Sequence, residues 1–334
     1  MKIGNISQSV LKRSVLKEIH INREEMIFAP AVEEMCAGIR IDREESDAVI
    51  MSSAVVFGDE KDLGYYGIAK AVNDIASRKA EPVGVEVVIQ LPPYAYESRL
   101  KAMVSNMEAC CQKNHLQILG VKASVNPMIQ SAMVYVSALG TARESQVIQT
   151  CKAEPDYDVV LLGSVGTEGA LRILNQRKES LEDRFIPSFF TGIQKCKDQI
   201  MAVEAIKKAI DLGAIAIHQL GDSGILAGLW ELGESSSIGL EVDLKQMTIR
   251  QDVIEICEFV GLNPYQLSST GSALIVTNQG NEIVEALSAL GYNSNIIGKT
   301  TSQNERVIFN GDEKRFLDRP AQGELLKLYS EEKI

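Results

Sequence analysis

Residues 159–174 read VVLLGSVGTEGALRIL: an apolar run, a glycine-rich turn and an amphipathic stretch follow one another without a gap. The run Val159–Leu162 is typical of a buried β-strand, and the spacing of apolar residues from 170 to 174 predicts a helix. A strand, a short turn and a helix in this order indicate an α/β architecture. The turn also presents backbone N–H groups at the positive end of a helix, where a phosphate or carboxylate can bind. The sequence is neither GxGxxG nor a Walker A motif, and glycine is common in any tight turn, so a purely structural turn stays open as the alternative.

A second stretch of the same construction follows further along the chain. Residues 218–224 read HQLGDSG, with an apolar strand pattern before them and an amphipathic helix pattern after them. Asp222 or Ser223 can cap that helix by bonding its free N–H groups, and a turn that faces a ligand is the alternative.

The first half of the chain contains a polar pair inside an apolar helix pattern. The Val- and Ile-rich run Ala48–Val56 predicts a strand, and apolar residues recurring at helical spacing predict a helix over 65–76. Asn73 and Asp74 lie within that helix, although both residue types are poor helix formers. They either lie on its solvated face or reach into a cleft, where Asp74 holds a cation or a water. Asp47, just before the strand, has the same two interpretations.

Strand and helix patterns alternate in both halves, which predicts two domains. The polar stretch 142–157, which contains Pro155, separates them, and we place the domains at 1–152 and 153–334. Residues 7–18 predict a short amphipathic helix that docks on the body or on a partner. Residues 178–190 lack clear periodicity and are expected to form a mobile or functional loop.

Composition narrows the classes of function. The chain has 334 residues and a net charge of −11, which disfavours nucleic acid and membrane surfaces as partners. No apolar run approaches the roughly 20 residues needed to cross a bilayer, and the start lacks a secretory layout, so we expect a cytoplasmic protein. Six cysteines without a CxxC pair and three scattered histidines predict neither a disulfide framework nor a zinc site. Cys110 and Cys111 are expected to act as small buried apolar residues.

Several of these stretches, in this order, resemble the AIR synthase (PurM-like) superfamily, and most closely its hydrogenase maturation factor E branch. The stretches are ESDAVI (45–50), AVNDIASRKAEP (71–82), the glycine turn 163–174, residues 219–226, GLEVD (239–243) and LNPY (262–265) with Gly271. The resemblance implies an α/β (α+β) fold of two domains. The N-terminal domain gives strands to a β-barrel shared in a homodimer, and an α/β domain follows.

The resemblance also implies a ligand site. In that family ATP lies in a groove between domains, Mg²⁺ and aspartates hold its phosphates, and the chemistry often activates an oxygen as a phosphate ester. Asp47 and Asp74 match metal-holding carboxylates. The positions implied for nucleotide or phosphate binding are Asp47, Asn73, Asp74, Lys122, Gly163, Gly166, Thr167, Gly169, Gly221 and Gly224.

Departures from the family pattern predict an altered metal site. Ser46 stands in place of one of two paired acidic residues, Ser52-Ser53 in place of Thr-Asp, and Lys122 in place of an aspartate. Each lost carboxylate removes a preferred ligand of Mg²⁺, so the site is expected to be degenerate. Lys122 either contacts an anionic ligand directly or forms an ordinary surface ion pair.

Two functions follow from the resemblance and its departures. The first is an enzyme that binds ATP or another phosphate-bearing ligand and activates a small amide or acid. The second is a non-catalytic homodimeric maturation or scaffold protein that works with a maturation partner protein. The maturation factor carries its carbamoyl group on a terminal cysteine, and no cysteine follows Cys257, so we expect that reaction not to run here in the family's way. The sequence assigns neither a catalytic residue nor a substrate.

Overall fold

The computed structural model describes residues 9, 26–28, 34, 36–41 and 47–330, and these residues divide into two compact units. Residues 26–28, 36–41 and 47–147 belong to the N-terminal unit, and residues 148–330 form the body of the C-terminal unit. The helix predicted over 7–18 lies outside the described residues, apart from residue 9. None of the described helices combines the length and apolar character that a membrane crossing needs.

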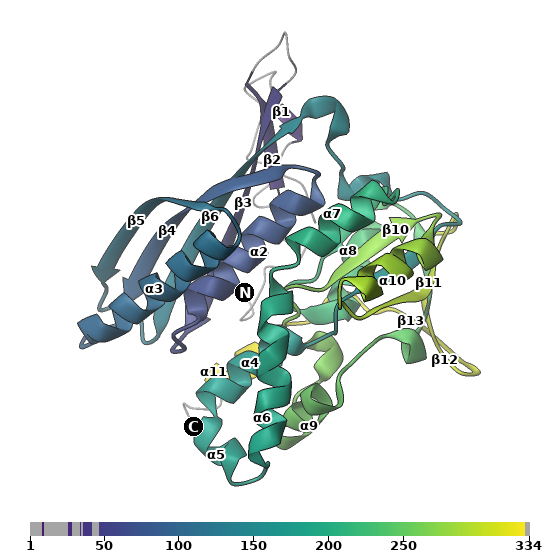
Figure 1. Cartoon of the computed structure of the whole chain (residues 1–334). Coiled ribbons are helices and arrows are strands. Elements are labelled where there is room, and N and C mark those ends of the chain that lie inside the picture. The colour runs from purple at the N-terminus through teal and green to yellow at the C-terminus, as the bar shows by residue number, and fades with distance from the viewer. Residues whose placement is uncertain (1–8, 10–25, 29–33, 35, 42–46, 331–334) are drawn as a thin grey trace. The chain divides into compact units, whose positions relative to one another are not determined.

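The N-terminal unit is a six-stranded mixed sheet with two helices against it (Figure 1). The strand order is β1-β2-β3-β6-β4-β5, and all neighbours are antiparallel except β4 and β5. The elements are β1 (Met26–Phe28), β2 (Cys36–Arg40), β3 (Asp47–Gly58), α2 (Leu63–Ser77), β4 (Glu81–Leu91), α3 (Glu97–Lys113), β5 (Gln117–Val125) and β6 (Ala132–Arg143).

The two faces of this sheet differ. Along β3 the even-numbered residues from 48 to 58 are buried and the odd-numbered ones are exposed or half-buried, as expected when one face packs and the other does not. Helix α2 packs on the buried face, against β3 and β6. On the other face Met51, Val55 and Tyr135 are each more than 40 % exposed, so an apolar surface stays open in the single chain.

The C-terminal unit is built on a seven-stranded sheet of order β13-β12-β9-β11-β7-β10-β8. Its strands are β7 (Asp158–Leu162), β8 (Ala216–Gln219), β9 (Gly239–Asp243), β10 (Ala273–Thr277), β11 (Ser294–Thr301), β12 (Arg306–Asn310) and β13 (Glu313–Phe316). Its helices are α4 (Thr167–Gln176), α5 (Lys178–Glu182), α6 (Pro187–Gln194), α7 (Val203–Asp211), α8 (Gly224–Ser236), α9 (Gln251–Val260), α10 (Gly280–Ala289) and α11 (Leu325–Ser330). Fully buried residues of β7, β10 and α8, such as Leu161, Leu274 and Leu229, form the centre of its core.

Most predicted elements are present, and one prediction is wrong. Residues 178–190 are not one loop, because they form α5, a four-residue connection and the first half of α6. Both helices are short, and Pro187 at the first turn of α6 supplies a start signal that periodicity does not register. The apolar strand pattern before residue 218 forms β8, which continues through His218 and Gln219. Strands β1, β2, β9 and β13 were not predicted.

Candidate functional site

The two glycine turns of the C-terminal unit lie at one edge of its sheet. Strand β10 is antiparallel to β7 on one side and to β8 on the other, so β7 and β8 run in the same direction. Ala273, the first residue of β10, pairs with Leu162 and with Gln219, the last residues of β7 and β8. The turns that follow these strands therefore flank the residues just before Ala273, and helices α4 and α8 both start at this edge.

A buried segment that the sequence did not identify joins the two turns. Residues 268–272 (SSTGS), here called the serine segment, precede β10, and their four hydroxyl side chains are at most 5 % exposed. Ser269 Oγ accepts the N–H of Gly166 at 2.8 Å, and the Ser269 N–H donates to the Gly221 carbonyl at 3.2 Å. Ser272 Oγ donates to the Ser164 carbonyl at 3.2 Å. The serine segment thus fixes both turns through bonds that span about 50 to 110 residues of chain.

The glycines of the first turn use their own N–H groups inside the protein. Gly163 donates to the Asn293 carbonyl at 2.7 Å, and Gly169 donates to the Ser268 carbonyl at 2.9 Å. Among the described hydrogen bonds, none uses the N–H of Ser164, Thr167 or Glu168. An anion at this turn would therefore bind the N–H groups at the start of α4 rather than those of the glycines.

The second turn has a different construction. Ser223 precedes α8 but makes no capping bond with its side chain, so of the two predicted caps, Asp222 and Ser223, Ser223 is excluded. The N–H of Gly224 donates to the Gly221 carbonyl at 3.2 Å, which closes the turn through the backbone. A Cβ added at Gly221 would meet no atom within 4 Å, so open space lies beside this residue.

A buried ion pair lies in the first turn of α4. Glu168 and Arg172 have side chains only 2 % and 3 % exposed, and their nearest nitrogen and oxygen are 3.2 Å apart. Ser268 Oγ donates to the other oxygen of Glu168. The carboxylate therefore connects α4 to the serine segment, and its position near the helix N-terminus suits the helix dipole. Sequence reasoning missed Glu168 because an acidic residue in a first helical turn is usually solvated.

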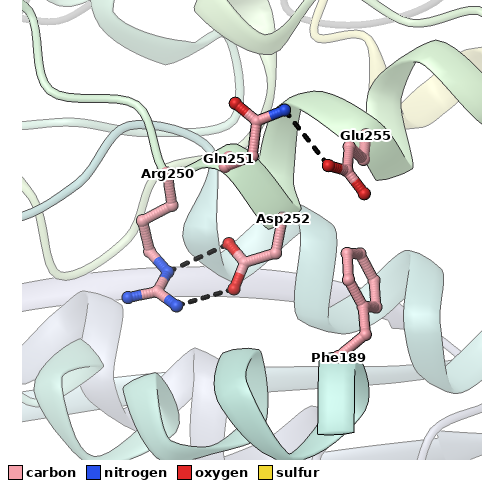
Figure 2. Close-up of a pocket in the computed structure, with 5 residues that line it drawn as sticks. All are labelled: Phe189, Arg250, Gln251, Asp252 and Glu255. Carbon is pink, nitrogen blue, oxygen red and sulfur yellow. Dashed lines mark hydrogen bonds and ion pairs between the residues drawn. The ribbon is translucent and has the colours of Figure 1, made fainter. Parts of the chain in front are cut away.

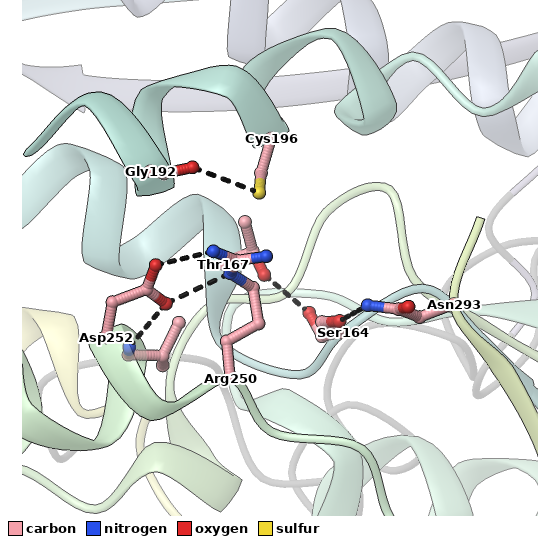
Figure 3. Close-up of polar contacts among 8 residues, drawn as sticks. Ser164, Thr167, Gly192, Cys196, Arg250, Asp252 and Asn293 are labelled. Carbon is pink, nitrogen blue, oxygen red and sulfur yellow. Dashed lines mark hydrogen bonds and ion pairs between the residues drawn. The ribbon is translucent and has the colours of Figure 1, made fainter. Parts of the chain in front are cut away.

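The start of α9 packs against the same turn (Figure 3). The Val165 N–H donates to the Thr248 carbonyl at 3.0 Å, and Arg250 forms a two-bond ion pair with Asp252 at 2.6 and 3.0 Å. The bond to Asp252 raises the pKa of Arg250. Burial raises the pKa of the Cys196 thiol, with Arg250 opposing and Asp252 adding to that change. Cys196 therefore stays a neutral thiol, whose hydrogen donates to the Gly192 carbonyl.

The candidate residues of the N-terminal unit divide between the two faces of its sheet. Asn73 and Asp74 are buried on α2, so the solvated-face alternative is wrong, and Ser52 Oγ donates to Asp74 at 2.8 Å. Asp47 belongs to the odd-numbered series of β3, on the opposite face from Ser52. Five residues of strand, roughly 16 Å, also separate Asp47 from Ser52. One chain therefore does not bring Asp47 and Asp74 together around a single Mg²⁺.

Lys122 lies on the open face in an exposed ion pair. Its ammonium is 3.1 Å from Glu86 on the neighbouring strand, and the two side chains are 75 % and 48 % exposed. We expect Lys122→Ala to change the free energy of unfolding by no more than about 0.5 kcal/mol, because exposed pairs contribute little. ATP titration of the folded variant then separates the two interpretations. A loss of about 10- to 150-fold in affinity assigns Lys122 to a phosphate. Unchanged affinity leaves it as the partner of Glu86.

Cysteine and acidic clusters add no metal site within the described part of the chain. No group of three or more His, Cys, Asp or Glu residues is arranged there to hold a metal ion. Cys110 and Cys111 are buried, as predicted. Burial raises the pKa of Cys111 to about 11 and that of Cys257 to about 12, so these thiols stay protonated at neutral pH.

Comparison with known proteins gives matches along most of the chain. Residues 33–142 match the model of the AIR synthase related protein N-terminal domain, and residues 154–310 match that of the C-terminal domain. A putative hydrogenase expression/formation protein of Methanocaldococcus jannaschii is 21% identical over 311 residues, covering 91% of this chain and 90% of that protein.

Two solved structures show the same fold. A chain of the HypE–HypF complex superposes with a TM-score of 0.73 at 17% identity, covering 93% of this chain and 99% of that chain. HypE, a hydrogenase maturation protein, in complex with ATP gives a TM-score of 0.69 at 17% identity, covering 97% of this chain and 98% of that chain. The two matched domain models and the two-domain α/β fold agree, and the chain belongs to the AIR synthase related family.

Proposed function

We propose that this protein is a HypE-like member of its family that binds ATP or another phosphate-bearing ligand and uses it to activate a small amide or acid. The observation that carries the proposal is the pairing of Ala273 with both Leu162 and Gln219. This pairing places two glycine turns, each followed by a helix, at one sheet edge. The N–H groups of Ser164, Thr167 and Glu168 would hold phosphate oxygens there. A solved relative described as HypE in complex with ATP supports the choice of ligand.

Mg²⁺ is expected to contribute little to this binding. The two carboxylates that match metal ligands lie on opposite faces of one sheet, and Asp74 already accepts a bond from Ser52. Isothermal titration with ATP should therefore give affinities with and without Mg²⁺ that differ by less than about tenfold, or 1.4 kcal/mol. Asp47→Asn should leave both affinities nearly unchanged. Binding that requires Mg²⁺ and is abolished by Asp47→Asn would show that the metal site is intact.

The same titration tests the phosphate site itself. Gly221→Ala adds a methyl group in open space beside the second turn and should lower ATP affinity without unfolding the protein. Lys122 lies in the N-terminal unit and Gly221 in the C-terminal unit, so the variant that loses ATP affinity shows which unit holds the phosphates. Absence of binding by ATP, ADP and inorganic phosphate would refute the proposed function.

A non-catalytic scaffold is the second candidate, and the Ser52–Asp74 bond favours it. Ser52 stands where the family usually has a Thr, followed by an Asp that is here Ser53, and it occupies an oxygen of the matched carboxylate Asp74. Both functions include ligand binding, but only the enzyme releases ADP or AMP from ATP. Incubation of the protein with ATP and a panel of small amides and acids, followed by nucleotide chromatography, distinguishes the two. A solved HypE–HypF complex supports a protein partner for either function.

We also propose that the protein is a homodimer through the open face of the N-terminal sheet. Met51, Val55 and Tyr135 lie more than 40 % exposed on that face, and exposed apolar patches of this kind mark interaction sites. Light scattering should give twice the chain mass of 36.6 kDa at micromolar concentration. Val55→Lys should give a monomer, because a charge buried at an interface is costly.

The control for the dimer is Leu290→Lys, which changes an apolar residue that is 37 % exposed in the other unit. This variant should stay dimeric. A wild-type protein that is strictly monomeric, or a Val55→Lys variant that is still a dimer, would contradict the proposed interface.

A further inference from the structure

Half of the phenylalanines of this chain gather in one place on the C-terminal unit. The chain has eight phenylalanines, and four of them make ring contacts with one another around α6 and α9. Phe185 and Phe189 stack with ring centres 4.2 Å apart, and Phe259 of α9 meets Phe185 edge-on at 6.2 Å. Phe190 adds an edge contact to Phe189 at 5.7 Å.

This cluster is at the surface and not in the core. Ile186 is 70 % exposed and Phe259 is 42 % exposed, and the other three rings are only partly buried. We call Phe185, Ile186, Phe189, Phe190 and Phe259 the aromatic surface. Aromatic residues concentrated on an exposed face are typical of protein interfaces, because they bury a large area at a small entropic cost.

An open pocket lies beside the aromatic surface (Figure 2). Its volume is about 410 Å³, and Phe189, Arg250, Gln251, Asp252 and Glu255 line it. In Figure 2 the ring of Phe189 projects from α6 toward the start of α9. Arg250 immediately precedes α9, and Gln251, Asp252 and Glu255 lie in its first turns. A pocket with one aromatic wall and one polar wall suits an amphipathic partner.

The charged residues that line the pocket indicate which sign of charge a partner carries there. Arg250 is already bound by both oxygens of Asp252, so this pair is neutral. Glu255 accepts a bond from the Gln251 amide at 3.1 Å, and no Lys, Arg or His of the described chain pairs with it. Exposed Glu258 follows one turn later, next to Phe259. Glu255 and Glu258 therefore place two carboxylates along the α9 side of the aromatic surface, and these attract a basic group.

We propose that the aromatic surface and its pocket are a docking site for a basic amphipathic helix of a partner protein. An aliphatic side chain of that helix enters the pocket against Phe189, and a Lys or Arg one turn away pairs with Glu255. This is the helix-in-groove mode, in which apolar anchors supply affinity and charges supply orientation. This docking site rests on the proposed function in one respect, since it would bind the protein partner proposed there. It does not depend on ATP binding.

The probe is a fluorescently labelled 14-residue helix of leucine and lysine, with a leucine–glutamate helix as the matched control. Anisotropy is measured on the full chain at about 0.15 M salt, where long-range attraction to the net negative charge is screened. We expect binding of the leucine–lysine helix and none of the leucine–glutamate helix. Phe259→Ser and Glu255→Lys should each weaken binding by at least tenfold.

Two variants elsewhere in the same unit act as controls for these changes. Phe316→Ser removes a phenylalanine that is 62 % exposed on β13, and Glu313→Lys reverses a charge on an exposed residue of the same strand. Both should bind the probe like the wild type. Ile186→Ser, at a residue that is 70 % exposed, tests the aromatic surface without risk to the core.

Several results would overturn the inference. They are equal binding by all variants, preference for the leucine–glutamate helix, and no binding of either helix. A change of oligomeric state in Phe259→Ser would instead assign the surface to a second copy of this chain. ATP titration of the same variants should match the wild type, so a failure of this inference and a failure of the proposed nucleotide function are distinguishable.

Discussion

Replacing Gly224 by alanine is expected to destabilise the C-terminal unit by about 3 kcal/mol or more. The backbone of Gly224 has φ +71°, a left-handed conformation that costs other residues roughly 1–2 kcal/mol. An added Cβ would also lie 2.4 Å from the Tyr265 carbonyl oxygen, in the short helix Pro264–Gln266, and overpacking of this kind costs roughly 1–3 kcal/mol. Backbone atoms, unlike a flexible side chain, cannot move aside cheaply.

Urea unfolding followed by tryptophan fluorescence measures this effect in the correct unit. The chain has one tryptophan, Trp230, which lies on α8 and packs against the core of the C-terminal unit. Gly221→Ala, three residues earlier, is the matched control, since its Cβ meets nothing within 4 Å and its φ is not left-handed. The control should stay within about 0.5 kcal/mol of the wild type. Equal unfolding midpoints for both variants would contradict the packing of the second turn.

Removing the buried carboxylate of Glu168 is expected to cost about 3–5 kcal/mol. Glu168→Ala leaves the buried guanidinium of Arg172 without this carboxylate, and breaking a buried ion pair from one side has a cost of that size. The change also removes the acceptor of the Ser268 hydroxyl, which connects α4 to the serine segment. Trp230 fluorescence in urea again reports the loss.

The control is an ion pair of the same spacing on the surface. Lys178 and Glu182 are also four residues apart on a helix, but their side chains are 64 % and 51 % exposed. Glu182→Ala should therefore change the free energy of unfolding by less than about 0.5 kcal/mol. The double variant Glu168→Gln with Arg172→Met should recover part of the loss, because the buried guanidinium is then removed together with its carboxylate. A Glu168→Ala variant as stable as Glu182→Ala would refute the role given to this pair.

The sequence alone predicted the elements whose pattern is local. The Val- and Ile-rich run Ala48–Val56 predicted β3, and helical spacing over 65–76 predicted α2, because composition and spacing of this kind are local properties of the chain. The strand, glycine turn and helix of residues 159–174 were predicted for the same reason. The helices within residues 178–190 were not predicted, because the sequence there has no apolar stripe at helical spacing. In the structure, stacking of the Phe185 and Phe189 rings packs the start of α6 instead.

Only the tertiary structure decided which residues share a site. Asp47 and Asp74 are both acidic and only 27 positions apart. The alternation of side chains along β3 and the packing of α2 nevertheless place them on opposite faces of one sheet. The serine segment joins turns that are distant in sequence, and Glu168 is buried because Ser268 and Arg172 surround it. These arrangements depend on strand pairing and on side-chain packing between residues far apart in sequence, 22 positions for Ser52–Asp74 and about 50 to 110 for the serine segment. No local period of a sequence records such contacts.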